Sequence, residues 1–323
     1  MSVRWGLLST AHINDLILAG ARRSDRLKFI AVASRNAARA QDYARANEIE
    51  RGYGSYEALL ADPDVEVVYI SLPNGLHVPW SVRALEAGKH VLCEKPRSRR
   101  ARDVEHAFEV ARREGRLLME AFMYRHNPQT FKLSELVEAG AIGSLQLVRS
   151  TFSFTVRDPE NVRLRPELDG GSLMDVGCYC VSGARLLAGE PERVYGDQVL
   201  GPSRVDIRFS GTLHFPNGVV SQFDSGLNLP VRDELEAIGD AGSIFLDDPW
   251  HCRTPRLELR GSGSVETIAV AVADSYQLEL ENLSDAVRGE AEPLLGPADA
   301  VGQARAIEAL YRSAEEGRSV LVE

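Results

Sequence analysis

The chain has few cysteines, no long apolar run and no signal-peptide layout. Its 323 residues include only Cys93, Cys178, Cys180 and Cys252, whose spacing matches no metal-binding motif. Most of them lie in apolar runs, so we expect free, buried thiols of the kind found in the reducing cytosol. No apolar run approaches the roughly 18 residues that a membrane-spanning helix needs. These absences predict a cytoplasmic protein with no metal site and no membrane partner.

An excess of positive charge is also absent. Lysine and arginine total 37 against 47 aspartates and glutamates, which gives a formal net charge of -10. This balance argues against a nucleic-acid partner, and the one basic stretch, 97–102, is short enough to be the start of a solvated helix. The 44% hydrophobic and 26% charged composition is that of an ordinary globular protein. The length favours two domains.

The first 122 residues alternate between strand-like and helix-like segments. The apolar run 65–72 is continuous enough to be a strand buried on both faces. Helical patterns of about 10–15 residues separate most of the strands, which is typical of right-handed βαβ units in a doubly wound parallel sheet. The expected strands are 3–8, 28–33, 52–54, 65–72, 90–93 and 117–122.

After residue 122 the pattern changes, because strands follow one another in runs. Hairpin signals occur at 215–218 and 239–242, within a strand-rich stretch from 193 to 272. Such runs predict an α+β domain with a mostly antiparallel open sheet. We therefore expect one α/β domain at 1–122 and a second domain at 123–323. The expected elements of the second domain are a strand at 145–156 and helices at 129–139, 170–187, 276–288 and 298–315.

The turn after the first strand lacks the leading glycines of a dinucleotide-binding motif. Where Gly-x-Gly is usual, the chain has Ser9, Thr10 and Ala11, followed by His12 and Ile13. The order of strand, turn and helix still suits phosphate binding at a helix N-terminus. We expect residues 9–13 to bind the cofactor, with the hydroxyls of Ser9 and Thr10 adding to the backbone N–H groups.

The end of the second strand lacks the acid that usually binds the ribose of NAD. It carries Ser34 and Arg35 instead. A hydroxyl followed by a guanidinium suits the 2′-phosphate of NADP, through charge-assisted hydrogen bonds. The alternative is a solvated arginine at a helix start. NADP is therefore favoured over NAD.

Polar residues also follow the fourth and fifth strands. Pro73, Asn74 and His77 follow the fourth, and Glu94 and Lys95 stand before a proline that ends the fifth. Ligands bind at the carboxyl edge of such sheets, so we expect these five residues to line the cofactor site. The alternatives are a helix cap for Asn74, a helix-opening role for His77, and a surface ion pair for Glu94 and Lys95.

Three motifs in this order resemble the Gfo/Idh/MocA family. They are Pro-Asn-x-x-His at 73–77, Glu-Lys-Pro at 94–96 and Gly-Gly-x-x-x-Asp-x-x-x-Tyr at 170–179. Segments 118–122 and 161–163 look most like the branch of dimeric dihydrodiol dehydrogenase and NADP-dependent D-xylose dehydrogenases. The resemblance implies a Rossmann domain followed by a substrate-binding and oligomerisation domain in a homodimer or homotetramer. The turn at residues 9–11 and Tyr179, where many members have histidine, depart from the family pattern.

The third motif supplies candidate catalytic residues. Asp175 and Tyr179 are four residues apart on an expected helix, so they share one face. Hydride transfer at a carbinol carbon needs a group that moves the hydroxyl proton, and a tyrosine beside an ammonium group is suited to this. We assign Tyr179 as proton donor and acceptor, Lys95 as the group that tunes it and orients the substrate oxygen, and Asp175 and Arg163 as substrate-binding residues. The alternatives are that Lys95 itself moves the proton, or that Tyr179 is a core residue.

The resemblance and the residues together predict an NADP-dependent oxidoreductase acting on a sugar or cyclic diol. A keto-sugar reductase of a biosynthetic pathway is an alternative in the same fold. A non-catalytic regulator that senses NADP(H) is a third possibility, but a sensor has no need of both Lys95 and Tyr179.

Overall fold

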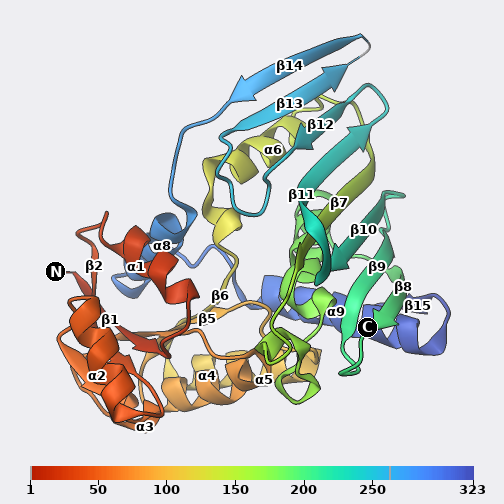
Figure 1. The fold of residues 1–323 in the computed structure, drawn as a ribbon. Coiled ribbons are helices and arrows are strands. Elements are labelled where there is room, and N and C mark those ends of the chain that lie inside the picture. The colour runs from red at the N-terminus through yellow and green to blue at the C-terminus, as the bar shows by residue number, and fades with distance from the viewer. Residues whose placement is uncertain (1, 262) are drawn as a thin grey trace. The chain divides into compact units, whose positions relative to one another are not determined.

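The computed structural model describes residues 2–261 and 263–323 and divides into two compact units (Figure 1). The first unit contains the chain up to Ser98, Arg102–Met123 and Asp274–Val301. The second contains Arg99–Ala101, Tyr124–Ala273 and Gly302–Glu323. No helix within the described residues has both the length and the apolarity needed to cross a membrane.

The first unit is built on a six-stranded sheet in the order β3-β2-β1-β4-β5-β6. Every neighbouring pair is parallel, which confirms the predicted doubly wound α/β sheet. The strand order reverses between β1 and β4, and ligands of such sheets bind where these carboxyl ends diverge. The strands are β1 Val3–Leu8, β2 Leu27–Ala33, β3 Arg51–Tyr53, β4 Val67–Ile70, β5 His90–Glu94 and β6 Leu118–Ala121.

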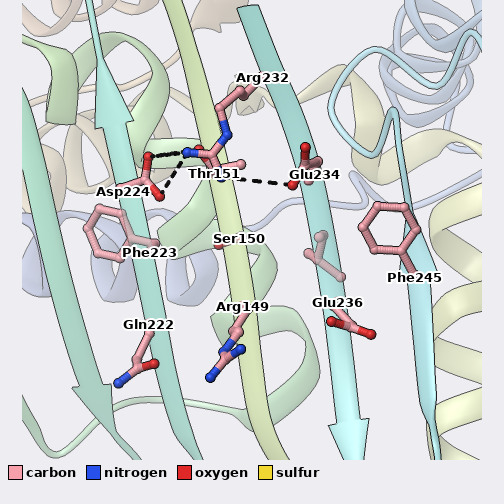
Figure 2. A pocket seen from close by; sticks show the side chains of 11 residues that line it. Arg149, Ser150, Thr151, Gln222, Phe223, Asp224, Arg232, Glu234, Glu236 and Phe245 are labelled. Atoms are coloured by element: carbon pink, nitrogen blue, oxygen red, sulfur yellow. Dashed lines mark hydrogen bonds and ion pairs between the residues drawn. The ribbon is translucent and has the colours of Figure 1, made fainter. Parts of the chain in front are cut away.

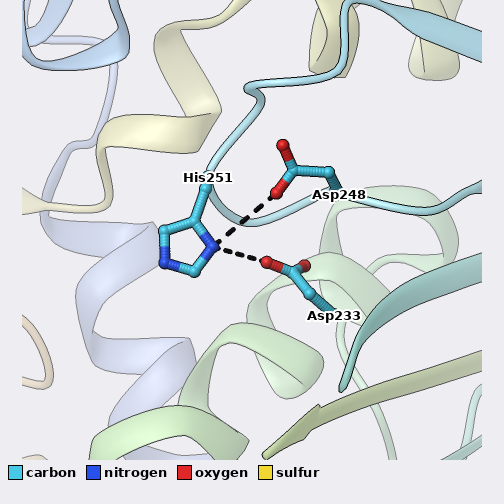
Figure 3. A group of neighbouring side chains, drawn as sticks. All are labelled: Asp233, Asp248 and His251. Atoms are coloured by element: carbon cyan, nitrogen blue, oxygen red, sulfur yellow. Dashed lines mark hydrogen bonds and ion pairs between the residues drawn. The ribbon is translucent and has the colours of Figure 1, made fainter. Parts of the chain in front are cut away.

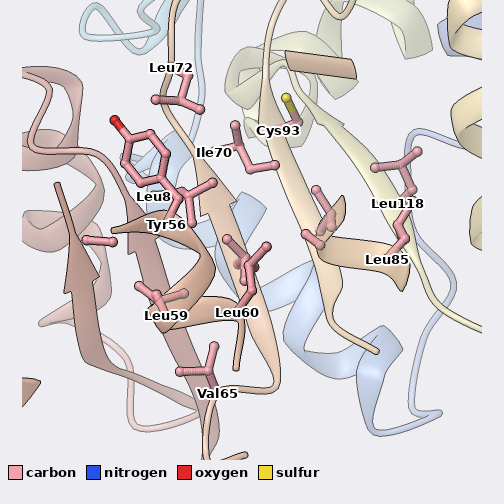
Figure 4. Packing of buried hydrophobic residues seen from close by; sticks show 14 of the residues in the cluster. Leu8, Tyr56, Leu59, Leu60, Val65, Ile70, Leu72, Leu85, Cys93 and Leu118 are labelled. Atoms are coloured by element: carbon pink, nitrogen blue, oxygen red, sulfur yellow. The ribbon is translucent and has the colours of Figure 1, made fainter. Parts of the chain in front are cut away.

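Helices cover both faces of this sheet. On one face, side chains of α3, α4 and α5 join Leu8, Ile70 and Cys93 of the strands in a buried apolar core (Figure 4). On the other face, α1 packs against α8. This core fixes the strands whose carboxyl ends carry the candidate site. The helices are α1 Ile13–Ala21, α2 Ala37–Ala46, α3 Tyr56–Leu60, α4 His77–Glu86, α5 Ala101–Glu114 and α8 Ser275–Val287.

Helix α8 belongs to the first unit, although a division of the sequence at residue 122 places it in the second domain. Trp5 Nε1 of β1 donates a 3.2 Å hydrogen bond to Ser284 Oγ of α8. Gly20 of α1 permits close contact, since a methyl group there would lie 2.7 Å from the backbone nitrogen of Gln277. These contacts join residues more than 250 positions apart, so the local sequence pattern cannot reveal them.

The second unit contains a nine-stranded sheet in the order β14-β13-β12-β11-β7-β10-β9-β8-β15. Only the β7–β10 pair is parallel among its described strand pairs, so the prediction of a mostly antiparallel sheet is confirmed. The strands are β7 Leu145–Thr155, β8 Arg193–Leu200, β9 Asp206–His214, β10 Val220–Gly226, β11 Asn228–Gly239, β12 Ser243–Leu246, β13 Arg256–Gly261, β14 Ser264–Ala269 and β15 Val320–Leu321.

Helix α7 packs against β7, β10 and β11 and covers part of one face of this sheet. Alternate residues of β7 show the two faces, since Val148 is fully buried while Arg149 is exposed. On the Arg149 side, charged and polar side chains of β7, β10 and β11 line a groove of about 330 Å³ (Figure 2). The helices of this part of the chain are α6 Pro128–Glu138, α7 Cys178–Ala188 and α9 Pro297–Glu316, whose first residues are grouped with the first unit.

Candidate active site

The turn after β1 has a serine where a glycine is usual. Ser9 has φ of +152°, in the region that favours glycine. Two buried polar contacts hold it there: Ser9 Oγ lies 2.7 Å from Ser71 Oγ, and Asn14 Nδ2 donates to Ser9 O at 2.9 Å. The two partners are joined to each other, because Ser71 Oγ donates to Asn14 Oδ1 at 2.7 Å. This network offsets the strain of the backbone and fixes the turn without the usual glycines.

The start of α1 suits the phosphates of a dinucleotide. The Ala11 N–H donates to Ser9 Oγ at 3.1 Å, which shapes the turn, and α1 begins at Ile13 with no side chain capping it. Within the described part of the chain, the backbone N–H groups of Thr10 and His12 have no hydrogen-bond partner. N–H groups at a helix N-terminus bind phosphate oxygens, so the residues predicted for this role fit the group.

Two arginines lie at the end of β2. Ser34 is buried and Arg35 is exposed, as is Arg39 one turn further along α2. Arg39 Nη2 donates to the carbonyl oxygen of Thr10 at 3.4 Å, which brings it to the turn after β1. Burial raises the pKa of the Tyr56 phenol, while the charges of Arg35 and Arg39 act on the same phenol and oppose this shift. Arg39 was not predicted from the sequence as a cofactor-binding residue, although it lies four residues after Arg35 and that spacing favours neighbouring side chains.

His77 holds two loops of the site together. It is 1% exposed, with Nδ1 2.8 Å from the carbonyl oxygen of Pro96 and Nε2 2.7 Å from that of Leu72. Burial lowers the pKa of His77 to about 4, so the ring is neutral near pH 7 and donates through only one nitrogen. Because both ring nitrogens face backbone oxygens, we assign His77 to positioning the Glu-Lys-Pro loop rather than to contacting the cofactor.

Pro73 and Asn74 form the bend after β4. Both are partly buried, and Asn74–Leu76 is a 3₁₀ turn closed by a 2.8 Å hydrogen bond from the Leu76 N–H to the Pro73 carbonyl oxygen. The residue at the N-cap of α4 is Leu76, so Asn74 does not cap this helix. The bend therefore presents Asn74 at the carboxyl edge of the sheet.

Lys95 follows the last residue of β5, as the sequence predicts. Both Lys95 and Glu94 are partly buried, and the hydroxyl of Tyr69 donates to Glu94 Oε1. The Arg97 N–H donates to Glu120 Oε1 at 2.8 Å and fixes the loop on its other side. The parallel strands β1, β2, β4 and β5 end at one edge, so the structure gathers the predicted residues of the first unit there.

In the second unit, two glycines precede the helix that carries Asp175 and Tyr179. Gly171 has φ of +127°, and a methyl group on it would lie 2.1 Å from Asp206 Oδ1. The buried Asp206 carboxylate accepts hydrogen bonds from Leu173 N at 2.7 Å, Ser172 Oγ at 3.0 Å and Tyr311 Oη at 2.9 Å. Glycine at this position therefore allows the backbone to approach Asp206, a residue that the sequence did not single out.

Asp175 and Arg163 form an ion pair. Arg163 Nε donates to Asp175 Oδ2 at 2.6 Å, and the Asp175 side chain is only 12% exposed. Two further bonds hold the arginine, from its N–H to Asn161 Oδ1 at 3.1 Å and from the Gly171 N–H to its carbonyl oxygen at 2.9 Å. The two residues predicted to bind substrate are therefore held together as one ion pair.

Tyr179 lies among aromatic rings. Its ring centroid is 5.4 Å from that of Phe152, 5.8 Å from that of Tyr124 and 5.9 Å from that of Trp250. The residue is 6% exposed. Contacts on several sides leave the ring little freedom and fix the direction of its hydroxyl.

The predicted helix 170–187 contains a π-helical turn at Leu173–Gly177, and α7 begins only at Cys178. Asp175 and Tyr179 lie on opposite sides of this junction, so the one-face relation expected from a regular α-helix does not apply unchanged. Such turns contain an additional residue and occur often at functional sites.

Asp233, Asp248 and His251 also lie close together, with possible ligand atoms within 4.8 Å of one another (Figure 3). His251 Nδ1 lies 2.5 Å from Asp233 Oδ2, and Asp248 pairs with Arg253 at 2.9 Å and accepts the Thr254 N–H at 3.0 Å. These carboxylates already serve protein donors, so we interpret the group as stabilising the loop after β12.

Two family models match most of the chain. Residues 6–122 match the oxidoreductase family with an NAD-binding Rossmann fold, and residues 131–245 match the GFO/IDH/MocA C-terminal domain. D-xylose 1-dehydrogenase (NADP(+)) 2 of Haloferax volcanii is 39% identical over 323 residues, covering 98% of each chain. The chain belongs to the GFO/IDH/MocA oxidoreductase family.

Two other proteins similar to this chain extend the comparison. Trans-1,2-dihydrobenzene-1,2-diol dehydrogenase of Sus scrofa is 33% identical, covering 79% of this chain and 77% of that protein. A 3-ketoreductase from Actinomadura kijaniata, solved with NADP and TDP-benzene, has a TM-score of 0.92 at 27% identity and covers 97% of this chain and 98% of its own. The resemblance predicted from the motifs is thereby confirmed, as is the oxidoreductase class.

Proposed function

We propose that the protein is an NADP-dependent oxidoreductase that transfers a hydride between nicotinamide and a carbinol or carbonyl carbon of a sugar or cyclic diol. The observation that carries the cofactor choice is the pair Arg35 and Arg39 at the end of β2, beside the buried Ser34. Two guanidinium groups and no carboxylate at this position suit a 2′-phosphate. The NADP-dependent xylose dehydrogenase and the NADP-bound ketoreductase support it.

The residues that would hold NADP follow successive strand ends. Residues 9–13 would bind the pyrophosphate, Ser34, Arg35 and Arg39 the 2′-phosphate, and Pro73, Asn74 and Glu94 the nicotinamide half. When bound, the nicotinamide ring supplies or accepts the hydride.

Side chains of the protein would move the hydroxyl proton and orient the substrate oxygen. We assign Tyr179 to donate or accept the hydroxyl proton, and Lys95 to orient that oxygen and favour the phenolate when the proton has left. The Asp175–Arg163 pair binds a second substrate hydroxyl, with the carboxylate accepting from it. The ketoreductase relative has been crystallised with a tyrosine replaced by phenylalanine and with a lysine replaced by alanine. These variants support the proposal that a tyrosine and a lysine are the important side chains.

The substrate class can be tested by absorbance at the nicotinamide band. We expect NADP to be reduced when the protein is given aldoses or vicinal diols, and a panel of pentoses, hexoses, polyols and cyclic diols ranks them. The alternative is a biosynthetic reductase, and a similar protein named dTDP-3,4-didehydro-2,6-dideoxy-alpha-D-glucose 3-reductase supports it. This alternative would be favoured if the protein reduced a keto-sugar with NADPH and oxidised no aldose or diol. Tight NADPH binding with no turnover in either direction would favour the regulator.

We also propose a homodimer or homotetramer that associates through the groove on the Arg149 face of the second sheet (Figure 2). The groove carries both signs of charge, with Arg232 paired to Asp224 at 3.1 Å and to Glu234 at 3.9 Å, so it can complement a second copy. Sedimentation at micromolar concentration checks this, and a pure monomer would contradict it. The four free, buried cysteines support a reducing, cytoplasmic location.

A further inference from the structure

His251, in the loop after β12, lies one aromatic ring away from Tyr179. The ring of Phe152 on β7 has its centroid 5.4 Å from that of Tyr179 and 5.4 Å from that of His251, and it meets both rings edge to face. All three residues belong to the second unit. The His251 side chain is 36% exposed, whereas Tyr179 is 6% exposed. A polar, accessible side chain that the proposed mechanism does not use therefore lies close to the proposed proton donor.

The position of His251 is fixed by the tryptophan that precedes it. Trp250 is fully buried, and its indole Nε1 donates to the carbonyl oxygen of Thr151 on β7 at 3.1 Å. Its backbone N–H donates to Asp233 Oδ1 of β11 at 3.2 Å. Gly183 of α7 leaves room for the indole, since a methyl group there would lie 2.8 Å from the nearest ring carbon. Because a helix and two strands hold Trp250, the residue after it has little freedom to move.

Two carboxylates orient the imidazole of His251. Its Nδ1 lies 2.5 Å from Asp233 Oδ2 and 3.7 Å from Asp248 Oδ1, so the neutral ring carries its proton on Nδ1 and Nε2 is an acceptor. Figure 3 shows Nε2 on the side of the ring that faces away from both carboxylates. Among the described residues, Nε2 has no hydrogen-bond partner. The loop therefore presents a hydrogen-bond acceptor in a fixed direction.

We propose that His251 Nε2 accepts a hydrogen bond from a substrate hydroxyl remote from the reacting carbon, and that the substrate is therefore a polyhydroxylated sugar rather than a cyclic diol. The inference rests on the function proposed for Tyr179 and names the substrate class of that same site. His251 is a specificity-determining residue, and no covalent bond is made or broken at it.

The number of polar groups in the second unit favours a sugar. Tyr179 binds the hydroxyl at the reacting carbon, the Asp175–Arg163 pair binds a second hydroxyl, and His251 binds a third. A vicinal diol has only two hydroxyls and leaves one of these groups without a partner, whereas an aldose can satisfy all three. A site built to bind a hydroxyl rejects an analogue that lacks it, because the polar group of the site is then unpaired. The ring of Phe152, between Tyr179 and His251, suits the apolar C–H groups of a sugar.

Two substitutions in the full-length protein separate substrate recognition from support of the loop. His251→Asn keeps an N–H donor near the position of Nδ1, and hence the contact with Asp233, but removes Nε2. His251→Gln is the matched variant, because its amide oxygen can lie near the position of Nε2. We expect the ratio of kcat/KM for D-xylose over trans-cyclohexane-1,2-diol to fall at least about tenfold in His251→Asn and to stay within about threefold of wild type in His251→Gln. The melting temperature of His251→Asn should stay near that of the wild type.

Calorimetric titration of D-xylose and D-glucose into the NADPH-loaded protein measures recognition without turnover. We expect the dissociation constant of the sugar that binds more tightly to rise at least about tenfold in His251→Asn and less than about threefold in His251→Gln. If the wild type turns over no substrate but this difference remains, the proposed function fails and the inference holds. A His251→Asn protein with the selectivity and sugar affinity of the wild type, equal losses in both variants, or a wild type that binds neither sugar would each overturn the inference.

Discussion

Asp206→Ala should release the first turn of the helix that carries Asp175 and Tyr179. The Asp206 carboxylate accepts three hydrogen bonds, and the one from the buried Leu173 N–H has no other described acceptor. Hydrogen bonds to a charged group contribute about 1.5–3 kcal/mol each, and an orphaned buried donor costs about 1–3 kcal/mol. Burial raises the pKa of Asp206, because the ionised carboxylate is costly to desolvate. Part of the free energy gained from the three hydrogen bonds therefore offsets this cost. We expect a net loss of about 2–4 kcal/mol.

Thermal melting and steady-state kinetics measure the two consequences separately. For a chain of this size the loss corresponds to a melting temperature about 3–6 °C lower. The activity should fall by more than the folded fraction accounts for, because a displacement of about 1 Å at a catalytic group can cost about 10²-fold in rate.

The control is Tyr311→Phe, which removes one of the three donors to Asp206 and leaves the Leu173 N–H bonded. We expect it to cost about 1.5 kcal/mol, the value of one such bond, and to leave kcat within about threefold of wild type. An Asp206→Ala protein with the melting temperature and the kcat of the wild type would refute the reasoning that Asp206 anchors this helix.

Two further predictions concern cofactor choice and acid stability. Arg35→Ala and Arg39→Ala should each lower the NADP-over-NAD ratio of kcat/KM by at least about tenfold, or about 1.4 kcal/mol, and an unchanged ratio in both would remove the basis for the 2′-phosphate site. Burial alone would raise the pKa of Glu66, but hydrogen bonds from Arg288 and the Arg4 N–H outweigh it and lower the pKa to about 2. Its ionised form therefore stabilises the fold above about pH 4.5, and this contribution is lost as the pH falls towards 2. Glu66→Gln should flatten this part of the stability profile, measured by urea unfolding between pH 2 and pH 6, and a profile as steep as that of the wild type would contradict the assignment.

The strand ends could be predicted because they depend on local pattern. Lys95 follows β5 and Ser34 follows β2 as expected, since alternating apolar segments and turn residues determine both positions. Gly170 and Gly171 also indicate a tightly packed backbone from the sequence alone, because glycine permits backbone conformations and contacts that other residues do not.

Other parts of the site depend on contacts between distant residues and could not be predicted. The Ser9 turn is held by Ser71 and Asn14, and Asp206 fills the space beside Gly171. Helix α8 has an ordinary helical pattern, and only the fold shows that it belongs to the first unit. The π-helical turn at Leu173–Gly177 leaves no signal in the apolar spacing.

The central claim is that the phenol of Tyr179 moves the substrate proton with help from Lys95. Tyr179→Phe keeps the ring contacts and removes only the hydroxyl, so NADPH affinity and melting temperature should stay near wild type while kcat falls by about 10²–10⁴. Lys95→Ala should cost a similar amount, and the double variant should fall far short of the product of the two losses. If Lys95 itself moves the proton, Lys95→Ala is nearly inactive and Tyr179→Phe changes KM more than kcat. The deciding measurement is the kcat of Tyr179→Phe at saturating substrate: a fall of at least about 10²-fold supports the account, and a value near that of the wild type contradicts it.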